Sequence, residues 1–342
     1  MYFASDNTGP AHPKVIEAIT RANTGYTPSY GDDPIMDQVR EKMRALLGAP
    51  QAEVHLVATG TAANVLALSS LGRPWDAIYC TPRAHIEEDE GNAPEFYTGG
   101  AKLMHVGSGA RMTAAELHAA VDGTGLHGVH GAARGPVSIT QVTERGDVYT
   151  LPQLQDLAAV AREFDLPLHM DGARFANAVA ALGCSAKDMS TDLGLDALSF
   201  GGTKNGLMGV EAVVLFTPDR ADQFERRRKR GAHLFSKHRY LSAQFDAYLT
   251  DDLWLELAQT ANANARHLFD GLQHEGMEIT SGGQANMGFV AIPTDLAHRL
   301  IDAGAQFYLY PPVGDNTICR FVCDWSLPRA QIDAFLALVA KG

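Results

Sequence analysis

The chain has 342 residues, and its 28 Lys and Arg against 40 Asp and Glu give a net charge of −12 at neutral pH. Nucleic acid and anionic membranes both require a basic face, so this charge argues against either as the main partner. With 46% hydrophobic and 20% charged residues, the composition is that of an ordinary soluble protein with a substantial core, and the length predicts about two domains.

Neither a signal peptide nor a membrane span is expected. The chain opens directly on a strand-like segment, and no apolar run approaches the roughly 18 residues that a membrane span needs. The four cysteines, Cys80, Cys184, Cys319 and Cys323, form no CxxC pair and no zinc-type spacing. We therefore expect free thiols, no metal site and a cytoplasmic protein.

The N-terminal part of the chain contains a candidate anion site. Ser5 lies in a polar arm before the first expected helix, where it could simply cap a turn. Residues 53–58 are expected to form a strand, and the turn Thr59-Gly60-Thr61 leads from it into a helix. The free N–H groups of a helix start and the helix dipole point at the same spot, which favours a bound anion. By itself, such a turn is only weak evidence for an anion site.

Alternating strands and helices continue to residue 164. His85 follows an expected strand at 77–81 and precedes the acidic residues 87–90, so it lies either at the rim of a site or on the surface beside a solvated loop. Glu144 follows the expected strand 136–142 in the turn TERG. The other elements expected in this part are a strand at 101–106 and helices at 113–121 and 152–164.

Two expected strands in the middle of the chain each deliver one reactive residue. Residues 166–170 lead into Asp171, and residues 197–200 lead into a glycine pair that presents Lys204 on a loop. Alone, Asp171 reads as a helix cap and Lys204 as a surface charge. Together, at strand ends where α/β sheets bind ligands, they indicate pyridoxal phosphate. A carboxylate keeps the pyridine nitrogen protonated, and a lysine carries the aldehyde as a Schiff base.

The C-terminal part predicts a smaller α+β unit. After a strand at 210–216, a cation-rich segment includes Arg226, Arg227 and Arg228, which we expect on a solvated face. Arg320 shares one face of an apolar strand with Val322, and a buried arginine is costly unless it meets an anion. We place the domain boundary between residues 1–247 and 248–342. The elements expected after it are a long helix from about 253, strands at 277–280, 288–292 and 317–323, and a helix at 330–339.

Five segments resemble, in the same order, the low-specificity L-threonine aldolases: ASDNTGPAHP, YGDDP, ATGTAAN, HMDGARFANA and SFGGTKNG. The resemblance extends from about Phe3 to Trp325. It implies a fold-type-I pyridoxal phosphate enzyme, with an aminotransferase-like large domain, a mostly parallel sheet and a small C-terminal α+β domain. It also implies a homodimer or homotetramer with sites at the subunit interface. The implied reaction cleaves threonine or allo-threonine to glycine and an aldehyde.

The resemblance also assigns roles to single residues. Glu144 departs from the family, which often carries a histidine there, so the base that removes the β-hydroxyl proton is left open between His85, Glu144 and a water. For the cofactor, the resemblance implies that Thr59, Gly60 and Thr61 bind the phosphate, His85 stacks on the ring, Asp171 contacts the ring nitrogen and Lys204 binds the aldehyde. For the substrate carboxylate it implies Ser5, Arg174 and Arg320, and Arg174 is also implied to contact the cofactor. Lys229 and Arg239 are implied to reach the neighbouring subunit's site near the phosphate.

Two alternatives stay open at this point. One is another pyridoxal phosphate reaction on the same fold, either transamination or β-elimination. The other is a catalytically silent binding protein that keeps the pocket for regulation, although no DNA-binding segment precedes the cofactor fold. An assay for acetaldehyde released from L-threonine separates all of these.

Overall fold

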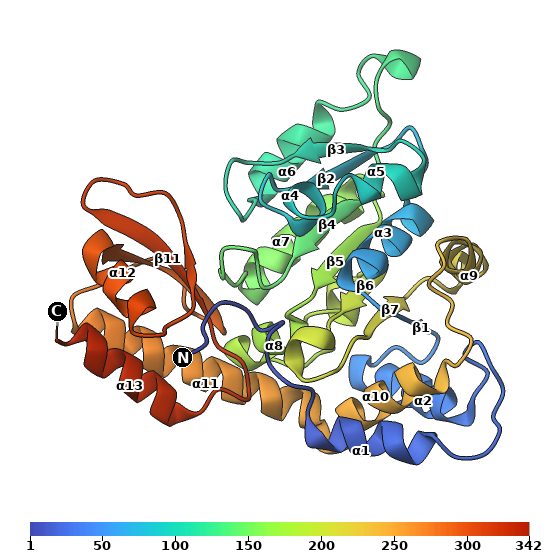
Figure 1. Ribbon diagram of the computed structural model, residues 1–342. Coiled ribbons are helices and arrows are strands. Elements are labelled where there is room, and N and C mark those ends of the chain that lie inside the picture. Colours follow the sequence, from blue (N-terminus) through green and yellow to red (C-terminus); the bar gives the residue numbers. More distant parts are fainter. Residues whose placement is uncertain (342) are drawn as a thin grey trace.

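The computed structural model describes residues 1–341 and contains a large sheet of seven strands (Figure 1). The strands are β1 (Glu53–Val57), β2 (Ala77–Cys80), β3 (Lys102–His105), β4 (Val137–Thr140), β5 (Leu168–Gly172), β6 (Ala197–Phe200) and β7 (Glu211–Leu215). Their order is β1-β7-β6-β5-β4-β2-β3. Only β7 is antiparallel to its neighbours, so β5 and β6 end at the same edge of the sheet.

Helices cover both faces of this sheet. They are α1 (Pro13–Ala22), α2 (Pro34–Leu47), α3 (Gly60–Leu71), α4 (His85–Glu88), α5 (Ala93–Thr98), α6 (Ala114–Asp122), α7 (Leu151–Glu163), α8 (Phe175–Leu182), α9 (Ala221–Arg230) and α10 (Arg239–Leu249). Along β7, Ala212 and Val214 join one apolar cluster with α2, α8 and α10, whereas Val213 and Leu215 join another with α3 and α9. Burial on both faces explains why these strands read as unbroken apolar runs.

A second, antiparallel sheet of four strands forms the smaller unit. Its strands, in the order β10-β11-β9-β8, are β8 (Glu278–Gly282), β9 (Met287–Pro293), β10 (Tyr308–Leu309) and β11 (Asn316–Val322), and its helices are α11 (Leu253–His274), α12 (Thr294–Asp302) and α13 (Arg329–Val339). Figure 1 shows α11 as a long helix along the base of the molecule. It starts in the core of the large sheet with Leu253 and Leu257, and ends in the core of the small one with Leu268 and Leu272.

The N-terminal arm is fixed to the smaller unit. Phe3 is fully buried in the small core, its N–H donates to the carbonyl of Gln306 at 2.7 Å, and its carbonyl accepts from the N–H of Val322 at 2.8 Å. The residues that follow Phe3 therefore pass between the two sheets, which places Asp6 and Asn7 close to the ends of β5 and β6.

The predicted architecture, a mostly parallel sheet followed by a smaller α+β unit, is confirmed. The four cysteines are free, as expected. The sequence pattern did not reveal α4, α5, α9, α10, α12 or the two-residue strand β10. The domain boundary at residues 247 and 248 stays a prediction. Within residues 1–341, no helix has the length and apolar character that crossing a membrane requires.

The expectation that Arg226, Arg227 and Arg228 form a solvated face is wrong for Arg228. Arg228 is only 5% exposed, and its Nη1 donates to the carbonyl of Leu56 at 3.4 Å. It lies one helical turn after Phe224, which is fully buried against the sheet, so both side chains occupy the same face of α9. Arg227 is partly buried and donates from Nη1 to the carbonyl of Tyr97 at 3.1 Å, whereas Arg226 matches the expectation and pairs with an acidic side chain on the exposed helix face.

Candidate functional site

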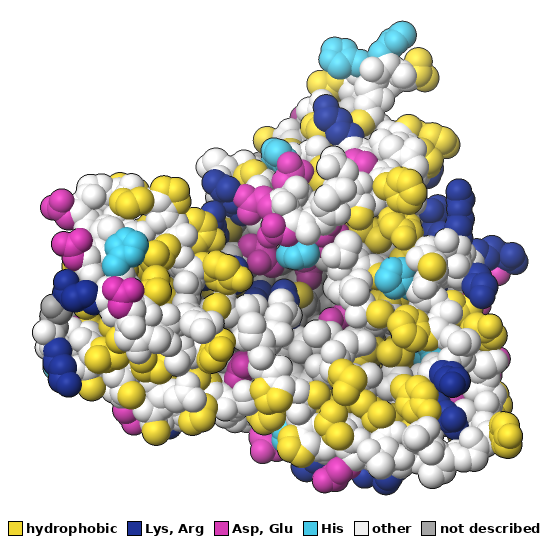
Figure 2. Space-filling view, viewed as in Figure 1, with side chains coloured by type: hydrophobic (Ala, Val, Ile, Leu, Met, Phe, Trp, Pro, Cys, Tyr) yellow, Lys and Arg dark blue, Asp and Glu magenta, His cyan; other side chains and the backbone are white. Residues whose placement is uncertain are grey.

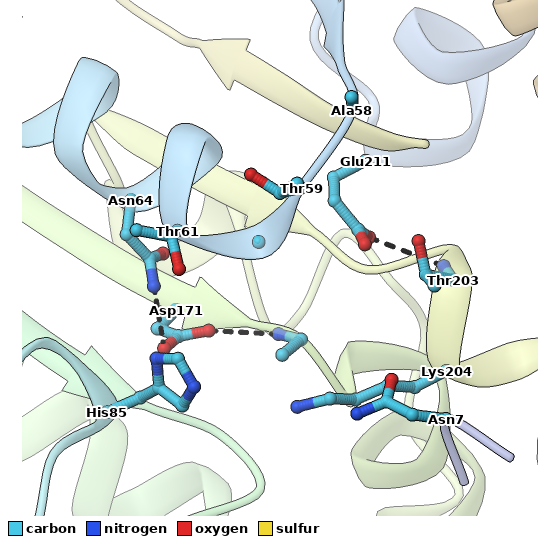
Figure 3. Close-up of a pocket in the computed structure, with 12 residues that line it drawn as sticks. Asn7, Ala58, Thr59, Thr61, Asn64, His85, Asp171, Thr203, Lys204 and Glu211 are labelled. Carbon is cyan, nitrogen blue, oxygen red and sulfur yellow. Dashed lines mark hydrogen bonds between the residues drawn. The ribbon is translucent and has the colours of Figure 1, made fainter. Parts of the chain in front are cut away.

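A cavity of about 250 Å³ opens at the edge of the large sheet where β5 and β6 end (Figure 3). Figure 2 shows a hollow in the middle of this face, with acidic and histidine side chains gathered on its wall. Six residues assigned to a site from sequence line the cavity together: Thr59, Gly60, Thr61, His85, Asp171 and Lys204. The other lining residues are Asn7, Ala58, Asn64, Ala173, Thr203 and Glu211.

The turn between β1 and α3 is built to bind an anion. Thr59 is the N-cap of α3, and its Oγ1 accepts from the N–H of Ala62 at 3.1 Å. The first N–H groups of a helix have no partner within the helix, so those of Gly60 and Thr61 are available to a ligand. A Cβ built on Gly60 would meet no atom within 4 Å, so the turn faces open space. This arrangement fits a phosphate group.

Lys204 is presented by a rigid backbone. It lies in a single 3₁₀ turn, η3 (Thr203–Asn205), directly after β6. A Cβ at Gly201 would lie 2.1 Å from the carbonyl oxygen of Ala173, so only glycine allows this close approach to the end of β5. Asn205 anchors the turn, because its Nδ2 donates to the hydroxyl of Tyr248 at 2.6 Å and to the carbonyl of Trp254 at 2.8 Å. The prediction that Lys204 sits on a loop is confirmed.

Asp171 has both carboxylate oxygens partnered and is 2% exposed. Its Oδ1 accepts from the N–H of Ala173 at 3.0 Å, and its Oδ2 accepts from Nδ2 of Asn64 at 3.0 Å. Asp171 therefore does not serve as the N-cap of the next helix, a position that Arg174 occupies. Its carboxylate faces the cavity from the end of β5, between the turn of α3 and the loop that carries Lys204 (Figure 3).

His85 begins α4 and lies at the rim of the cavity. Its Nδ1 is 2.8 Å from Oε1 of Glu90. Burial alone would lower the pKa of His85, but the hydrogen bond to Glu90 and the charges of Asp171 and Glu144 raise it above its usual value. The alternative of a surface histidine beside a solvated loop does not fit this environment.

Arg174 is buried and already paired. Its Nε donates to Oδ2 of Asp6 at 2.7 Å and its Nη2 to Oδ1 of the same carboxylate at 2.9 Å. Burial alone would lower the pKa of Arg174, but the charges of Asp6 and Glu144 raise it. Nη1 is buried with no hydrogen-bond partner among residues 1–341. The guanidinium therefore keeps Nη1, one of its three nitrogens, for a ligand rather than the whole fork.

Ser5 and Arg320 are each engaged with the N-terminal arm. Oγ of Ser5 accepts from the N–H of Asn7 at 3.1 Å, which is the turn-capping role, and Asn7 rather than Ser5 lines the cavity. Arg320 donates from Nη2 to the carbonyl of Ala4 at 2.9 Å, and its guanidinium lies 4.6 Å from the centroid of the Tyr308 ring. In the described part of the chain, Nε of Arg320 is buried and unpartnered.

Six residues assigned from sequence do not line the cavity of their own chain: Ser5, Glu144, Arg174, Lys229, Arg239 and Arg320. Nζ of Lys229 lies 4.9 Å from the centroid of the Tyr30 ring, and Nη1 of Arg239 donates to backbone carbonyls of the loop before α2. Glu144 acts on the site through its charge, which raises the pKa values of both His85 and Arg174.

The sequence did not identify several polar side chains at the site. Of these, Asn64 had the clearest sequence signal, because it is a polar residue in a mostly apolar helix. Every residue of that helix from Ala62 to Leu71 is buried. Glu211 stands at the start of an apolar strand, where its Oε2 accepts from the N–H of Gly202 at 2.6 Å. Burial raises the pKa of Glu211 despite this bond and the nearby charge of Lys204. Nothing in the residues next to Asp6 or Glu90 indicated that either lies near the site.

A family model described as beta-eliminating lyase matches residues 2–294. The chain is 37% identical over 333 residues to a low-specificity L-threonine aldolase of Pseudomonas sp. (strain NCIMB 10558), covering 96% of this chain and 94% of that protein. A low-specificity L-threonine aldolase of Pseudomonas aeruginosa is 37% identical over 328 residues, or 94% and 92% of the two chains. The solved structure of a threonine aldolase from Leishmania major matches with a TM-score of 0.93 and 26% identity, covering 99% and 98% of the two chains.

Proposed function

Because the chain belongs to the beta-eliminating lyase family, we propose that it acts as a low-specificity L-threonine aldolase. It is a pyridoxal phosphate-dependent lyase that breaks the Cα–Cβ bond of L-threonine, L-allo-threonine and related β-hydroxy-α-amino acids, releasing glycine and an aldehyde. The observation that carries this proposal is a single cavity in which the phosphate-binding turn of α3 meets His85, Asp171 and Lys204.

The lining residues fit the cofactor group by group. The N–H groups at the helix start, in Thr59, Gly60 and Thr61, would bind the phosphate. The Asp171 carboxylate would bind the ring nitrogen, and the Lys204 amine would bind the aldehyde. When bound, pyridoxal phosphate withdraws electrons from the substrate Cα through its protonated ring. The tasks left to the chain are to bind the substrate carboxylate, to orient the bond that breaks and to move a proton.

Arg174 and Arg320 are the proposed carboxylate ligands. Each keeps one buried donor nitrogen unpartnered within the described residues, Nη1 in Arg174 and Nε in Arg320. A buried donor without a partner is costly, and a carboxylate is the strongest acceptor that a substrate amino acid offers. By fixing the carboxylate, the two arginines set the rotation about the substrate N–Cα bond and therefore decide which bond of Cα breaks.

We expect Arg320→Lys to weaken glycine binding by about 1.5 to 3 kcal/mol, the range for hydrogen bonds to charged groups, because lysine keeps the charge but loses the planar fork. Binding is measured by titrating the purified protein with glycine. Arg329→Lys, an exposed change at the start of α13, is the matched control. Unchanged affinity in Arg320→Lys would leave Arg320 only its structural bond to the carbonyl of Ala4.

His85 is the proposed base for the β-hydroxyl proton. Its Nδ1 is held by Glu90, which leaves Nε2 as the free ring nitrogen. An imidazole has an ordinary pKa near neutrality, which suits proton transfer, whereas a carboxylate such as Glu144 is a weaker base unless it is desolvated. A water held by either residue could serve in the same position.

We expect His85→Asn to lower kcat for threonine by roughly 100-fold or more, the usual scale for loss of a general base. Cofactor and glycine binding should persist, and both are followed spectroscopically. His118→Asn, at a half-exposed histidine on α6, is the control for replacing a histidine elsewhere. If His85→Asn keeps its turnover while Glu144→Gln loses it, Glu144 is the base instead.

The reaction itself is tested by incubating the protein with L-threonine and cofactor and coupling acetaldehyde to an alcohol dehydrogenase. Formation of a keto acid with an added amino acceptor, and no aldehyde, would indicate a transaminase. Ammonia with a keto acid but no acceptor would indicate β-elimination. Without any turnover, the protein would be a silent binding protein.

We also propose that the enzyme is a homodimer or homotetramer with sites at the subunit interface. Lys229 and Arg239 support this, because neither lines the cavity of its own chain and they lie near the end of α9 and at the start of α10, on either side of the segment that joins the two helices. The free cysteines support a reducing cytoplasm as its compartment.

A further inference from the structure

Glu90 is a buried carboxylate inside a sequence that reads as a solvated acidic run. Its side chain has no solvent exposure, whereas Glu87 and Glu88 of the same segment are partly exposed and lie against His105 and Arg83 at the surface. Oε1 of Glu90 lies 2.8 Å from Nδ1 of His85 and accepts from Nδ2 of Asn64 at 2.9 Å. Oε2 is buried without a hydrogen-bond partner within residues 1–341.

The contact between Glu90 and His85 determines where the imidazole carries its proton. An ionised carboxylate only accepts hydrogen bonds, so His85 must present Nδ1–H to it. A neutral imidazole has one N–H, so Nε2 then keeps its lone pair and is the nitrogen free to accept a proton. The other charged groups that act on His85, Asp171 and Glu144, are also carboxylates and raise its pKa in the same direction.

Asn64 connects this pair to the floor of the cavity. Its single Nδ2 group donates to Oε1 of Glu90 and to Oδ2 of Asp171, so one amide holds two buried carboxylates in place. Figure 3 shows Asn64 above Asp171, with the ring of His85 below it. Burial raises the pKa of Glu90, which makes its carboxylate a stronger acceptor than an exposed one, although its hydrogen bonds to His85 and Asn64 lower it in part.

We propose that Glu90 is a positioning residue that fixes His85 with Nδ1–H directed at Oε1, so that Nε2 stands free as the base in the cavity, while Asn64 holds Glu90 and Asp171 together. The inference rests on the proposed function, in which His85 removes the β-hydroxyl proton. Glu90 itself does not line the cavity, so its proposed role is exerted through His85.

The test is Glu90→Gln in the full-length protein, which keeps the shape of the side chain and removes its charge. The pKa of His85 is measured by NMR on protein with ¹⁵N-labelled histidine, and His85→Asn identifies the resonance. With the charge gone, burial dominates, so the pKa of His85 should fall by about one unit or more. In the wild type above this pKa, the spectrum should show the tautomer with Nδ1–H.

The kinetic readout separates positioning from a structural role. The base must be deprotonated, so kcat/KM rises as pH passes upward through the pKa of His85. In Glu90→Gln this limb should move to lower pH, and kcat at the plateau should fall about tenfold or more, because a misplaced tautomer impairs the base. A structural defect would lower the plateau without moving the limb. Glu90→Asp, which keeps the charge, should keep the limb near its wild-type position and serves if the glutamine variant does not fold.

Glu88→Gln is the matched control, since it removes a carboxylate two residues away that pairs with Arg83 at the surface. An Nε2–H tautomer in the wild type, or a His85 pKa in Glu90→Gln equal to that in Glu88→Gln, overturns the inference. If the wild type releases no acetaldehyde from threonine, the proposed function fails, but the NMR measurement still tests the pairing of His85 with Glu90.

Discussion

Lys204→Ala is expected to lower kcat for threonine by about 10⁴-fold or more. Lys204 is the only lysine among the residues that line the cavity, so its amine is the proposed attachment point for the cofactor aldehyde. Removing the reacting nucleophile of an enzyme costs more than removing one polar contact, and in a serine protease it amounts to about 10⁶-fold. In the wild type, borohydride should fix the cofactor to the peptide that contains Lys204, and in the variant this labelling should be lost.

The variant should remain folded, because the backbone around Lys204 does not depend on its side chain. Asn205 anchors the turn through Tyr248 and Trp254, and Gly202 donates to Glu211. Unchanged thermal melting would show this. Lys102→Ala, on an exposed position of β3, is the matched control and should keep both labelling and turnover. A trapped peptide containing a different lysine would contradict the assignment.

The parts of the site that the sequence predicted are those encoded by neighbouring residues. Asp171 directly follows a short apolar strand, and Lys204 follows a strand and a glycine pair. Both patterns depend only on residues that are close together in the sequence. The Thr59 turn is of the same kind, because capping depends on residues three apart. Since β5 and β6 are adjacent and parallel, these local predictions also brought Asp171 and Lys204 to the same edge.

The partners of these residues could not be predicted, because they come from distant parts of the chain. Asn64 meets Asp171 across 107 positions, and Asp6 meets Arg174 across 168 positions. The sequence therefore assigned Arg174 to the substrate carboxylate and the cofactor without revealing Asp6, whereas the structure shows Nε and Nη2 of Arg174 paired with Asp6. Glu90 was hidden for another reason, since three acidic residues precede it and only the fold distinguishes it from them.

The burial of Arg228 could have been predicted from the sequence. Phe224 and Arg228 are four residues apart and so share one face of α9, and a phenylalanine in a run of charges marks the face that packs. The prediction of a solvated face considered only the charges of this segment and not the spacing of Phe224 and Arg228, which is that of an amphipathic helix.

Asp171→Ala is expected to lower kcat by on the order of a thousandfold or more, the scale of losing a preorganised electrostatic contact, while the protein stays folded. The proposed role of the carboxylate is to keep the ring nitrogen protonated, which no other residue at the end of β5 can do. Activity and cofactor absorbance are measured together, with Asp156→Ala, on an exposed position of α7, as the control. Near-normal turnover with cofactor bound would contradict the assignment.

Asp171→Asn separates the charge of Asp171 from its structural contacts. Alanine leaves the N–H of Ala173 and one of the two N–H groups on Nδ2 of Asn64 without an acceptor, and each buried donor left so costs about 1 to 3 kcal/mol, so Asp171→Ala should also melt at lower temperature. Asparagine still accepts from the N–H of Ala173, so it loses only the bond from Asn64, whose Nδ2 keeps Oε1 of Glu90 as an acceptor. We therefore expect Asp171→Asn to lose kcat nearly as far as alanine does while its melting temperature stays closer to that of the wild type. If asparagine instead restores turnover, the contribution of Asp171 is the shape of its hydrogen bonds and not its charge.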